Sequence, residues 1–282
     1  MERRDLLTFG SAVIPLLAGC TALEGGNGAP ESATETATAT ATPTETATST
    51  STPTTTGEAS VRDVLVTPFL VALTTADAVG TVGARDEQFV VASVAGTVAY
   101  EDFSLVAGDT THAPEDIESN NFYRGVYLDR TSYPHESGTE GYVLFVLPKP
   151  LDVRSATLQW PGGEHALESA AIERLARPPT TFEVTEFTAP SSVSLGETAT
   201  VSLTVENVGE NTGTFVAGLN RSGPLVAYVP VASVYLDVDP GGTATWTHEY
   251  RATDDDAVGR AAEFKLRWRD GDRRTATIQI QE

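Results

Sequence analysis

Thiol chemistry is confined to one position of this chain, because Cys20 is its only cysteine. Zinc–cysteine sites, iron–sulfur clusters, c-type haem and blue copper all need cysteine ligands. One thiol also forms no disulfide within a chain. We therefore expect none of these cofactors, and a fold that depends on its apolar core alone. Cys20 follows an apolar run over residues 6–18, which itself follows Arg3 and Arg4.

The first twenty residues indicate an export signal. The apolar run of about 13 residues suits a signal peptide and is shorter than the ~20 residues of a membrane-spanning helix. Its end, residues 17–20 (LAGC), resembles the lipobox of prokaryotic lipoproteins, which implies cleavage before Cys20 and a lipid on Cys20. Arg3 and Arg4 resemble a twin-arginine export signal, which serves folded proteins. The alternative is a plain membrane helix, or a buried helix with an incidental cysteine.

The other chemically active side chains form no catalytic pattern. The histidines, His112, His135, His165 and His248, are too scattered for two of them to share a helix face. No His-Glu-x-x-His motif, Gly-x-Ser-x-Gly elbow or phosphate-binding loop occurs. Residues 254–256 (DDD) offer carboxylates to calcium, but they lack the ligand spacing of a calcium loop, so a solvated loop is the competing interpretation. We predict no catalytic residue, no metal and no cofactor.

Acidic residues dominate the composition. The chain has 39 Asp and Glu against 18 Lys and Arg, a net charge of −21, and its only lysines are Lys149 and Lys265. Carboxylates hold water and cations in concentrated salt, which also screens their mutual repulsion. The composition therefore indicates a halophile and a lipoprotein of haloarchaeal type, with an ordinary acidic protein as the alternative. It lacks the basic face that nucleic-acid binding requires, so we exclude nucleic acid as a partner.

Residues 20–60 are predicted to be the lipidated cysteine and a disordered stalk. The segment consists mainly of Thr, Ala, Glu, Pro, Ser and Gly. Burial of so little apolar surface does not offset the cost of ordering the backbone, about 1–2 kcal/mol per residue. A Thr/Pro-rich tract of this kind is expected to be extended, either O-glycosylated or as an unmodified linker.

Beyond the stalk, the pattern predicts an all-β protein with two domains, residues 61–178 and 179–282. Short runs of β-branched and aromatic residues end at Gly, Pro or Asp. Residues 161–163 (PGG) predict a hairpin turn, and only residues 170–176 suggest a helix. Residues 177–179 (RPP) mark the boundary, because consecutive prolines neither continue a helix nor donate to a β-ladder.

Both domains resemble immunoglobulin-like families. Residues 194–197 (SLGE), 206–209 (ENVG) and 239–242 (DPGG) resemble the cell-adhesion-related domain of bacteria and archaea. That resemblance implies an immunoglobulin-like sandwich without catalytic residues. Residues 88–98 and 141–148 are similar to the telokinin-like domains of uncharacterised lipoproteins. We therefore expect two immunoglobulin-like β-sandwiches in tandem after the stalk.

Two kinds of surface feature are candidates for binding or modification. Tyr123, Tyr127 and Tyr133 are expected to stack on sugars or peptides, unless the alternate aromatics belong to the core. Asn220 begins an Asn-Arg-Ser sequon, which predicts N-glycosylation in an exported protein.

A basic stripe on the C-terminal hairpin is a third candidate. Its residues are Lys265, Arg267, Arg269, Arg273 and Arg274. A stripe of this kind on an acidic molecule favours docking to an acidic neighbour or a sulfated glycan. The alternative is that these side chains pair with carboxylates of their own domain.

Together these patterns predict a lipid-anchored protein on the extracellular face of the cell membrane. We expect a non-catalytic adhesion, scaffold or binding module adapted to high salt. Its expected partners are membrane lipid, through Cys20, and a cell-envelope protein or glycan. The alternative is an accessory or solute-binding subunit of a membrane transporter or enzyme complex, although such receptors usually have α/β lobes. An enzyme ranks third, because no set of base, nucleophile and oxyanion donors can be assembled.

Overall fold

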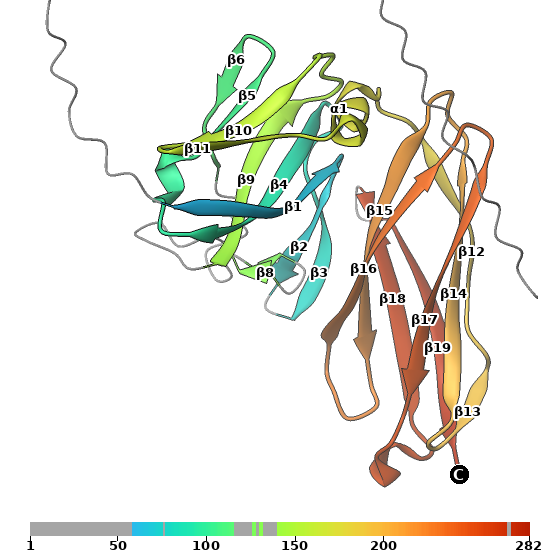
Figure 1. Cartoon of the computed structure of the whole chain (residues 1–282). Helices are drawn as coiled ribbons and strands as arrows, with labels where there is room; N and C mark the ends of the chain where they lie inside the picture. The colour runs from blue at the N-terminus through green and yellow to red at the C-terminus, as the bar shows by residue number, and fades with distance from the viewer. Residues whose placement is uncertain (1–57, 76, 116–125, 128–129, 132–139, 270–271) are drawn as a thin grey trace, which may run out of the picture. The chain divides into compact units, whose positions relative to one another are not determined.

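The strands expected from the sequence form four larger sheets and two short hairpins, and one α-helix occurs in the described part of the chain (Figure 1). The protein is therefore all-β in class. The structure is a computed structural model, and it describes residues 58–75, 77–115, 126–127, 130–131, 140–269 and 272–282. All of these residues belong to the compact unit Ser51–Glu282.

The N-terminal β region, from β1 to β11, contains two larger antiparallel sheets. The first has the order β1 (Ala59–Thr67), β4 (Glu87–Gly96), β9 (Glu140–Pro148). The second has the order β11 (Gly163–Ala166), β10 (Ala156–Trp160), β5 (Ser104–Ala107), β6 (Thr110–His112). In β4, Val90, Ala92 and Val94 belong to the core shared by both sheets, whereas Phe89 and Val91 are buried in a second cluster. Because side chains alternate along a strand, β4 is buried on both faces.

The C-terminal β region, from β12 to β19, also contains two sheets. The first has the order β12 (Phe182–Thr188), β14 (Thr198–Asn207), β17 (Thr243–Arg251). The second has the order β13 (Ser192–Ser194), β19 (Arg273–Gln281), β18 (Ala261–Trp268), β15 (Gly213–Ser222), β16 (Val229–Val238). Alternate residues of β14 face the core, because Val201, Leu203 and Val205 are buried in one cluster with Phe264 and Leu266 of β18.

The connection between the two β regions contains helix α1 (Ser169–Ala176), which confirms the predicted helix. The buried residues Ala171 and Leu175 attach α1 to the N-terminal core. The helix ends before residues 177–179, whose two prolines cannot continue it. Every described sheet takes its strands from one side of these residues. The remaining short elements are η1 (Tyr100–Asp102), η2 (Asp255–Ala257), β7 (Val126–Tyr127) and β8 (Arg130–Thr131).

Strand pairing tests two local predictions. Trp160 is paired with Gly163, which confirms the hairpin turn expected at residues 161–163. Strand β1 begins at Ala59, before the expected domain start at residue 61, because Ala59 is paired with Gly96. Composition alone places Ala59 in the stalk, but pairing with β4 makes it part of the sheet.

Within the N-terminal β region, β2 (Leu70–Thr75) and β3 (Ala78–Val82) form a hairpin that also contacts the C-terminal β region. On one side, Leu70 packs with Phe89 and Leu144 of the N-terminal β region, and Tyr235 of β16 packs against the same cluster. The hairpin therefore covers an apolar face of the sheet β1-β4-β9.

On its other side the hairpin is bonded to β15. The Val79 N–H donates to Oδ1 of Asn220 at 2.7 Å, and Nδ2 of Asn220 donates to the Val79 carbonyl at 2.9 Å. A Cβ at Gly218 would lie 3.0 Å from Cγ2 of Val79, so a larger residue would force the hairpin to shift by a few tenths of an ångström. The carboxamide of Asn220 thus bonds both the N–H and the carbonyl of Val79, as the backbone of a neighbouring strand would.

We expect Asn220→Ala to lower the free energy of unfolding by about 1–3 kcal/mol, because it leaves the partly buried amide and carbonyl of Val79 without their side-chain partner. Denaturant unfolding of the full chain in molar KCl measures this change. The control Thr200→Ala alters an exposed strand residue and should shift the stability by less than about 0.5 kcal/mol. An unchanged midpoint in Asn220→Ala would show that the hairpin contact does not contribute to stability.

Candidate functional site

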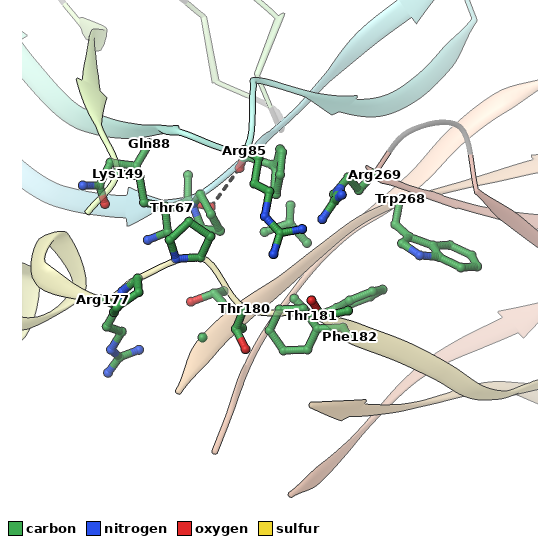
Figure 2. Close-up of a pocket in the computed structure, with 18 of the residues that line it drawn as sticks. Thr67, Arg85, Gln88, Lys149, Arg177, Thr180, Thr181, Phe182, Trp268 and Arg269 are labelled. Carbon is green, nitrogen blue, oxygen red and sulfur yellow. Dashed lines mark hydrogen bonds between the residues drawn. The ribbon is translucent and has the colours of Figure 1, made fainter. Parts of the chain in front are cut away.

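A pocket of about 230 Å³ lies where residues of both β regions meet (Figure 2). The N-terminal β region contributes the end of β1, the turn before β4, β4 itself and the segment after β9. The C-terminal β region contributes β12, β15 and the turn between β18 and β19, and the connection through α1 completes the lining. The site is therefore assembled from segments that are far apart in the sequence.

The pocket is lined mainly by cationic side chains, although the chain as a whole is acidic. Five cationic side chains line it: Arg85, Lys149, Arg174, Arg177 and Arg269. Asp272 is the one carboxylate among the described lining residues, whereas the chain as a whole carries −21. In Figure 2 the guanidinium group of Arg177 points away from Arg85 and Arg269. A concentration of cations in an acidic protein favours an anion in this pocket.

A carboxylate of the protein already engages two of these cations. Arg174 Nη2 lies 2.6 Å from Oδ2 of Asp237, and Arg177 Nη1 lies 3.4 Å from Oδ1. Thr214 donates to Oδ1 at 2.5 Å. Burial alone would raise the pKa of Asp237, but the hydrogen bonds from Thr214 and Arg174 and the two arginine charges hold that pKa below its ordinary value. Asp237 therefore remains ionised and ties the α1 segment to β16.

Lys149 has the most perturbed environment of the pocket cations. Burial first, and the nearby charge of Arg177 second, lower the pKa of Lys149 from 10.5 to about 8. Both effects disfavour the ammonium form, because it loses water and meets a like charge. An anion bound beside Lys149 would oppose both effects.

Gln88 supplies a buried polar atom to the same pocket. Its Nε2 donates to the carbonyls of Pro148 at 2.8 Å and Leu175 at 3.0 Å. These two acceptors fix the orientation of the amide, since Oε1 could not take the place of Nε2. The residue is 0% exposed, and Oε1 has no partner in the structure. A buried acceptor of this kind favours a hydrogen-bond donor beside it, which a ligand hydroxyl group or a water molecule can supply.

Aromatic rings form one wall of the pocket. Phe182 meets Phe215 edge to face at 5.8 Å between ring centroids, and Phe215 lies 6.3 Å from Trp268. The guanidinium of Arg274 lies 5.9 Å from the Trp268 ring centroid. Phe215 is 2% exposed and belongs to the core, so Phe182 and Trp268, which are partly exposed, offer the apolar surface beside the cations. This combination suits a ligand with both ionic and C–H surfaces.

The structure divides the predicted basic stripe. Lys265, Arg267 and Arg273 line one shallow depression on the hairpin, whereas Arg269 lines the pocket described above. Arg274 is paired with the buried Leu266 and so lies on the inner face of the hairpin. Alternation along β19 separates Arg274 from Arg273, because neighbouring residues of a strand point to opposite faces. Arg269 lies beyond the end of β18, in the turn of the hairpin.

Lys265 is engaged within its own domain. Its Nζ lies 3.3 Å from Oε2 of Glu263 and 5.1 Å from the centroid of the Tyr228 ring. The alternative interpretation of the stripe, pairing with carboxylates of the same domain, therefore applies to Lys265.

The predicted aromatic surface falls largely outside the described residues. Tyr123 and Tyr133 lie outside them, and Tyr127 is described only as part of β7. The residues predicted for export and lipidation also lie outside the described part: Arg3, Arg4 and Cys20.

The predicted glycosylation site is buried in the contact between β15 and the hairpin. Asn220 is 0% exposed, and its Nδ2, the atom that would carry a glycan, donates to the Val79 carbonyl. Glycosylation of Asn220 and this contact therefore exclude each other.

Two of the chemically active residue sets noted in the sequence have structural roles. His248 is stacked on Trp246, with centroids 6.1 Å apart, and burial followed by the charge of Arg221 lowers the pKa of His248. Asp254 caps η2, since its Oδ1 accepts from the Asp256 N–H at 2.9 Å.

The described residues contain no group of three or more His, Cys, Asp or Glu that could hold a metal ion. No helix among them is long and apolar enough to cross a membrane.

Sequence reasoning missed the pocket and its main cations, Arg85 and Lys149. One signal was available, because Lys149 is one of only two lysines and stands between Pro148 and Pro150. The rarity of lysine draws attention to Lys149, but the sequence offers no means of placing it in the same pocket as Arg269.

Comparison with known proteins identifies no family for this chain. No family model and no curated protein matches it. Among solved structures, the alkylpurine DNA glycosylase AlkC of Pseudomonas fluorescens is 14% identical, with a TM-score of 0.30 over 36% of this chain and 30% of that chain. A β-glucosidase from Listeria innocua is 15% identical, with a TM-score of 0.30 over 60% and 21%. The β-glucosidase DesR of Streptomyces venezuelae is 10% identical, with a TM-score of 0.28 over 75% and 47%.

The chain spans less than half the length of each of these structures. Likenesses at such TM-scores carry no argument about fold or function.

We expect the stability of the native chain to rise with pH between about pH 7 and pH 9.5, through Lys149. The pKa of Lys149 is about 8 in the folded chain against 10.5 for an ordinary lysine. In this window the unfolded chain therefore binds more protons, so the free energy of unfolding increases with pH. Denaturant unfolding at a series of pH values measures the slope. Lys149→Met should lose this contribution, whereas the control Lys265→Met should keep it. Equal slopes in the native chain and Lys149→Met would contradict the assignment.

Proposed function

We propose that this protein is a lipid-anchored, extracellular, non-catalytic binding or scaffold module of a halophile. The observation that carries the proposal is the arrangement of Arg3 and Arg4, the apolar run at residues 6–18, and Cys20. The run is long enough for a signal peptide and too short to span a membrane, and Cys20 stands where a lipoprotein signal is cleaved. The Thr/Pro-rich residues 21–57 then separate the anchor from the β regions.

Both β regions are immunoglobulin-like sandwiches in this proposal. Support comes from the buried Asn207, which links the two motifs of the cell-adhesion-related resemblance. Its Nδ2 donates to the Val238 carbonyl at 2.8 Å, and its Oδ1 accepts from the Gly209 N–H at 3.0 Å. Its backbone carbonyl accepts from the Gly241 N–H at 2.9 Å. Residues 206–209 and 239–242 thus form one hydrogen-bonded corner, which gives the resemblance a structural reason.

A binding role is supported by the pocket. The pocket combines cations, a buried polar atom without a partner and an aromatic wall, features of a site that holds a ligand. The same observation favours the second candidate, a solute-binding accessory subunit of a membrane complex. A pull-down from the native cell envelope in molar salt separates the two, because an accessory subunit should capture one integral membrane partner in a fixed ratio.

We expect incorporation of a lipid precursor into the native chain and none into Cys20→Ser, because the thiol is the attachment point. Metabolic labelling of cells that produce each chain, followed by gel separation, measures the incorporation. Thr21→Ala, which alters the next residue, is the control and should be labelled normally. Recovery of unlabelled native chain with an uncleaved leader would refute the anchor.

We expect the unfolding midpoint to fall as KCl is diluted from about 3 M to about 0.2 M, because counterions screen the repulsion between carboxylates. Thermal unfolding at several KCl concentrations measures the dependence. The double variant Asp255→Lys, Asp256→Lys changes two exposed residues and should reduce the dependence, since it makes the chain less acidic. A midpoint that is independent of salt, or higher in dilute salt, would contradict the proposed adaptation.

A further inference from the structure

We propose that the pocket between the two β regions binds a sugar acid, a small carboxylate that also carries hydroxyl groups. The inference rests on the proposed binding role and specifies its ligand. Three independent properties of the pocket carry it: the sign of its charge, its buried acceptor and its aromatic wall.

The charge of the pocket selects an anion. Arg85 and Lys149 come from separate segments and line the same space. A guanidinium presents paired donors that match the two oxygens of a carboxylate. An arginine already holds a carboxylate nearby, where Nη2 of Arg174 lies 2.6 Å from Oδ2 of Asp237.

The rest of the molecule restricts the size of that anion. The chain has 39 acidic residues, so a long polyanion would lie against carboxylates as soon as it left the pocket. A pocket of about 230 Å³ also suits one small molecule. The ligand is therefore a single acidic unit, either free or at the end of a glycan.

The buried acceptor selects a ligand that donates hydrogen bonds. Oε1 of Gln88 is buried without a partner, and its amide orientation is fixed by the carbonyls of Pro148 and Leu175. A carboxylate or an inorganic anion without protons cannot donate to Oε1. A hydroxyl group can, so the ligand combines an anionic group with hydroxyls.

The aromatic wall selects a ligand with a flat C–H face. Phe182, Phe215 and Trp268 lie in a chain of ring contacts, at centroid distances of 5.8 and 6.3 Å. Sugar rings present such faces between their hydroxyl groups, and aromatic rings bind them by stacking. Simple hydroxyl-free carboxylates use only part of this pocket.

Calorimetric titration of the full chain, at the lowest KCl concentration that keeps it folded, tests the proposal. The probes are D-glucuronate, D-glucose, acetate and inorganic sulfate. We expect glucuronate to bind at least about tenfold more tightly than each of the other three. Equal binding of glucose would overturn recognition of the charge. Equal binding of acetate or sulfate would overturn recognition of the hydroxyl groups. A complete absence of glucuronate binding would overturn the ligand class.

The two sources of this ligand are distinguished by a further titration. Tighter binding of a glucuronate-terminated oligosaccharide than of glucuronate supports the proposal and assigns the ligand to a glycan end. Tighter binding of free glucuronate supports the proposal and assigns the ligand to a solute.

Variants locate the site. Arg85→Gln and Lys149→Met should each weaken glucuronate binding about tenfold. Arg85 is exposed, so its replacement should leave the unfolding midpoint unchanged. Asp237→Asn should strengthen binding, because it removes the carboxylate that engages Arg174 and Arg177. The control Arg154→Gln replaces an exposed arginine outside the lining and should bind as the native chain does. Unchanged affinity in both Arg85→Gln and Lys149→Met would overturn the pocket as the site.

These experiments test the proposed lipid anchor and the proposed ligand independently of each other. Lipid labelling depends on Cys20 alone, and glucuronate titration depends on the pocket alone. Normal labelling without glucuronate binding would overturn only the ligand, whereas glucuronate binding by an unlabelled chain would overturn only the anchor.

Discussion

The two hydrogen bonds between Val79 and the amide of Asn220 are the contact on which the rest of this structure depends. They hold the β2–β3 hairpin on β15, at a place where Gly218 leaves room for it. The hairpin in turn covers the cluster around Phe89 on the sheet β1-β4-β9. Without it, the sheet β1-β4-β9 would expose this apolar cluster, in a chain that has no disulfide to compensate.

The same contact explains the position of the pocket. Once the hairpin brings the two β regions together, Arg85 and Lys149 of the first line one pocket with Arg269 of the second and with the connection through α1. Burial first, and the charge of Arg177 second, lower the pKa of Lys149 in this pocket. Asp237 offsets part of the positive charge by pairing with Arg174 and Arg177. Arg85 and Lys149, which these two ion pairs do not include, make the pocket a candidate for an anionic ligand.

Local patterns predicted only part of the candidate sites, and the basic stripe shows why. Its members are neighbours in sequence, but alternation along the hairpin sends Arg273 to one face and Arg274 to the other. The turn then carries Arg269 into a pocket formed with distant segments. Likewise the sequon at Asn220 is a three-residue pattern, and nothing in it reveals that the side chain bonds a backbone 141 residues away.

The sequence by itself determined the all-β class, the strand periodicity at residues such as Val201 and Leu203, the turn at residues 161–163 and the helix before residues 177–179. These features depend on residues close together in the chain, whose side-chain types restrict backbone conformation and burial. Only the tertiary structure decided the burial of β4 on both faces, the role of Asn220 and the meeting of Arg85 with Arg269. These features depend on which distant surfaces pack together, and many surfaces of similar apolar character are compatible with the same local pattern.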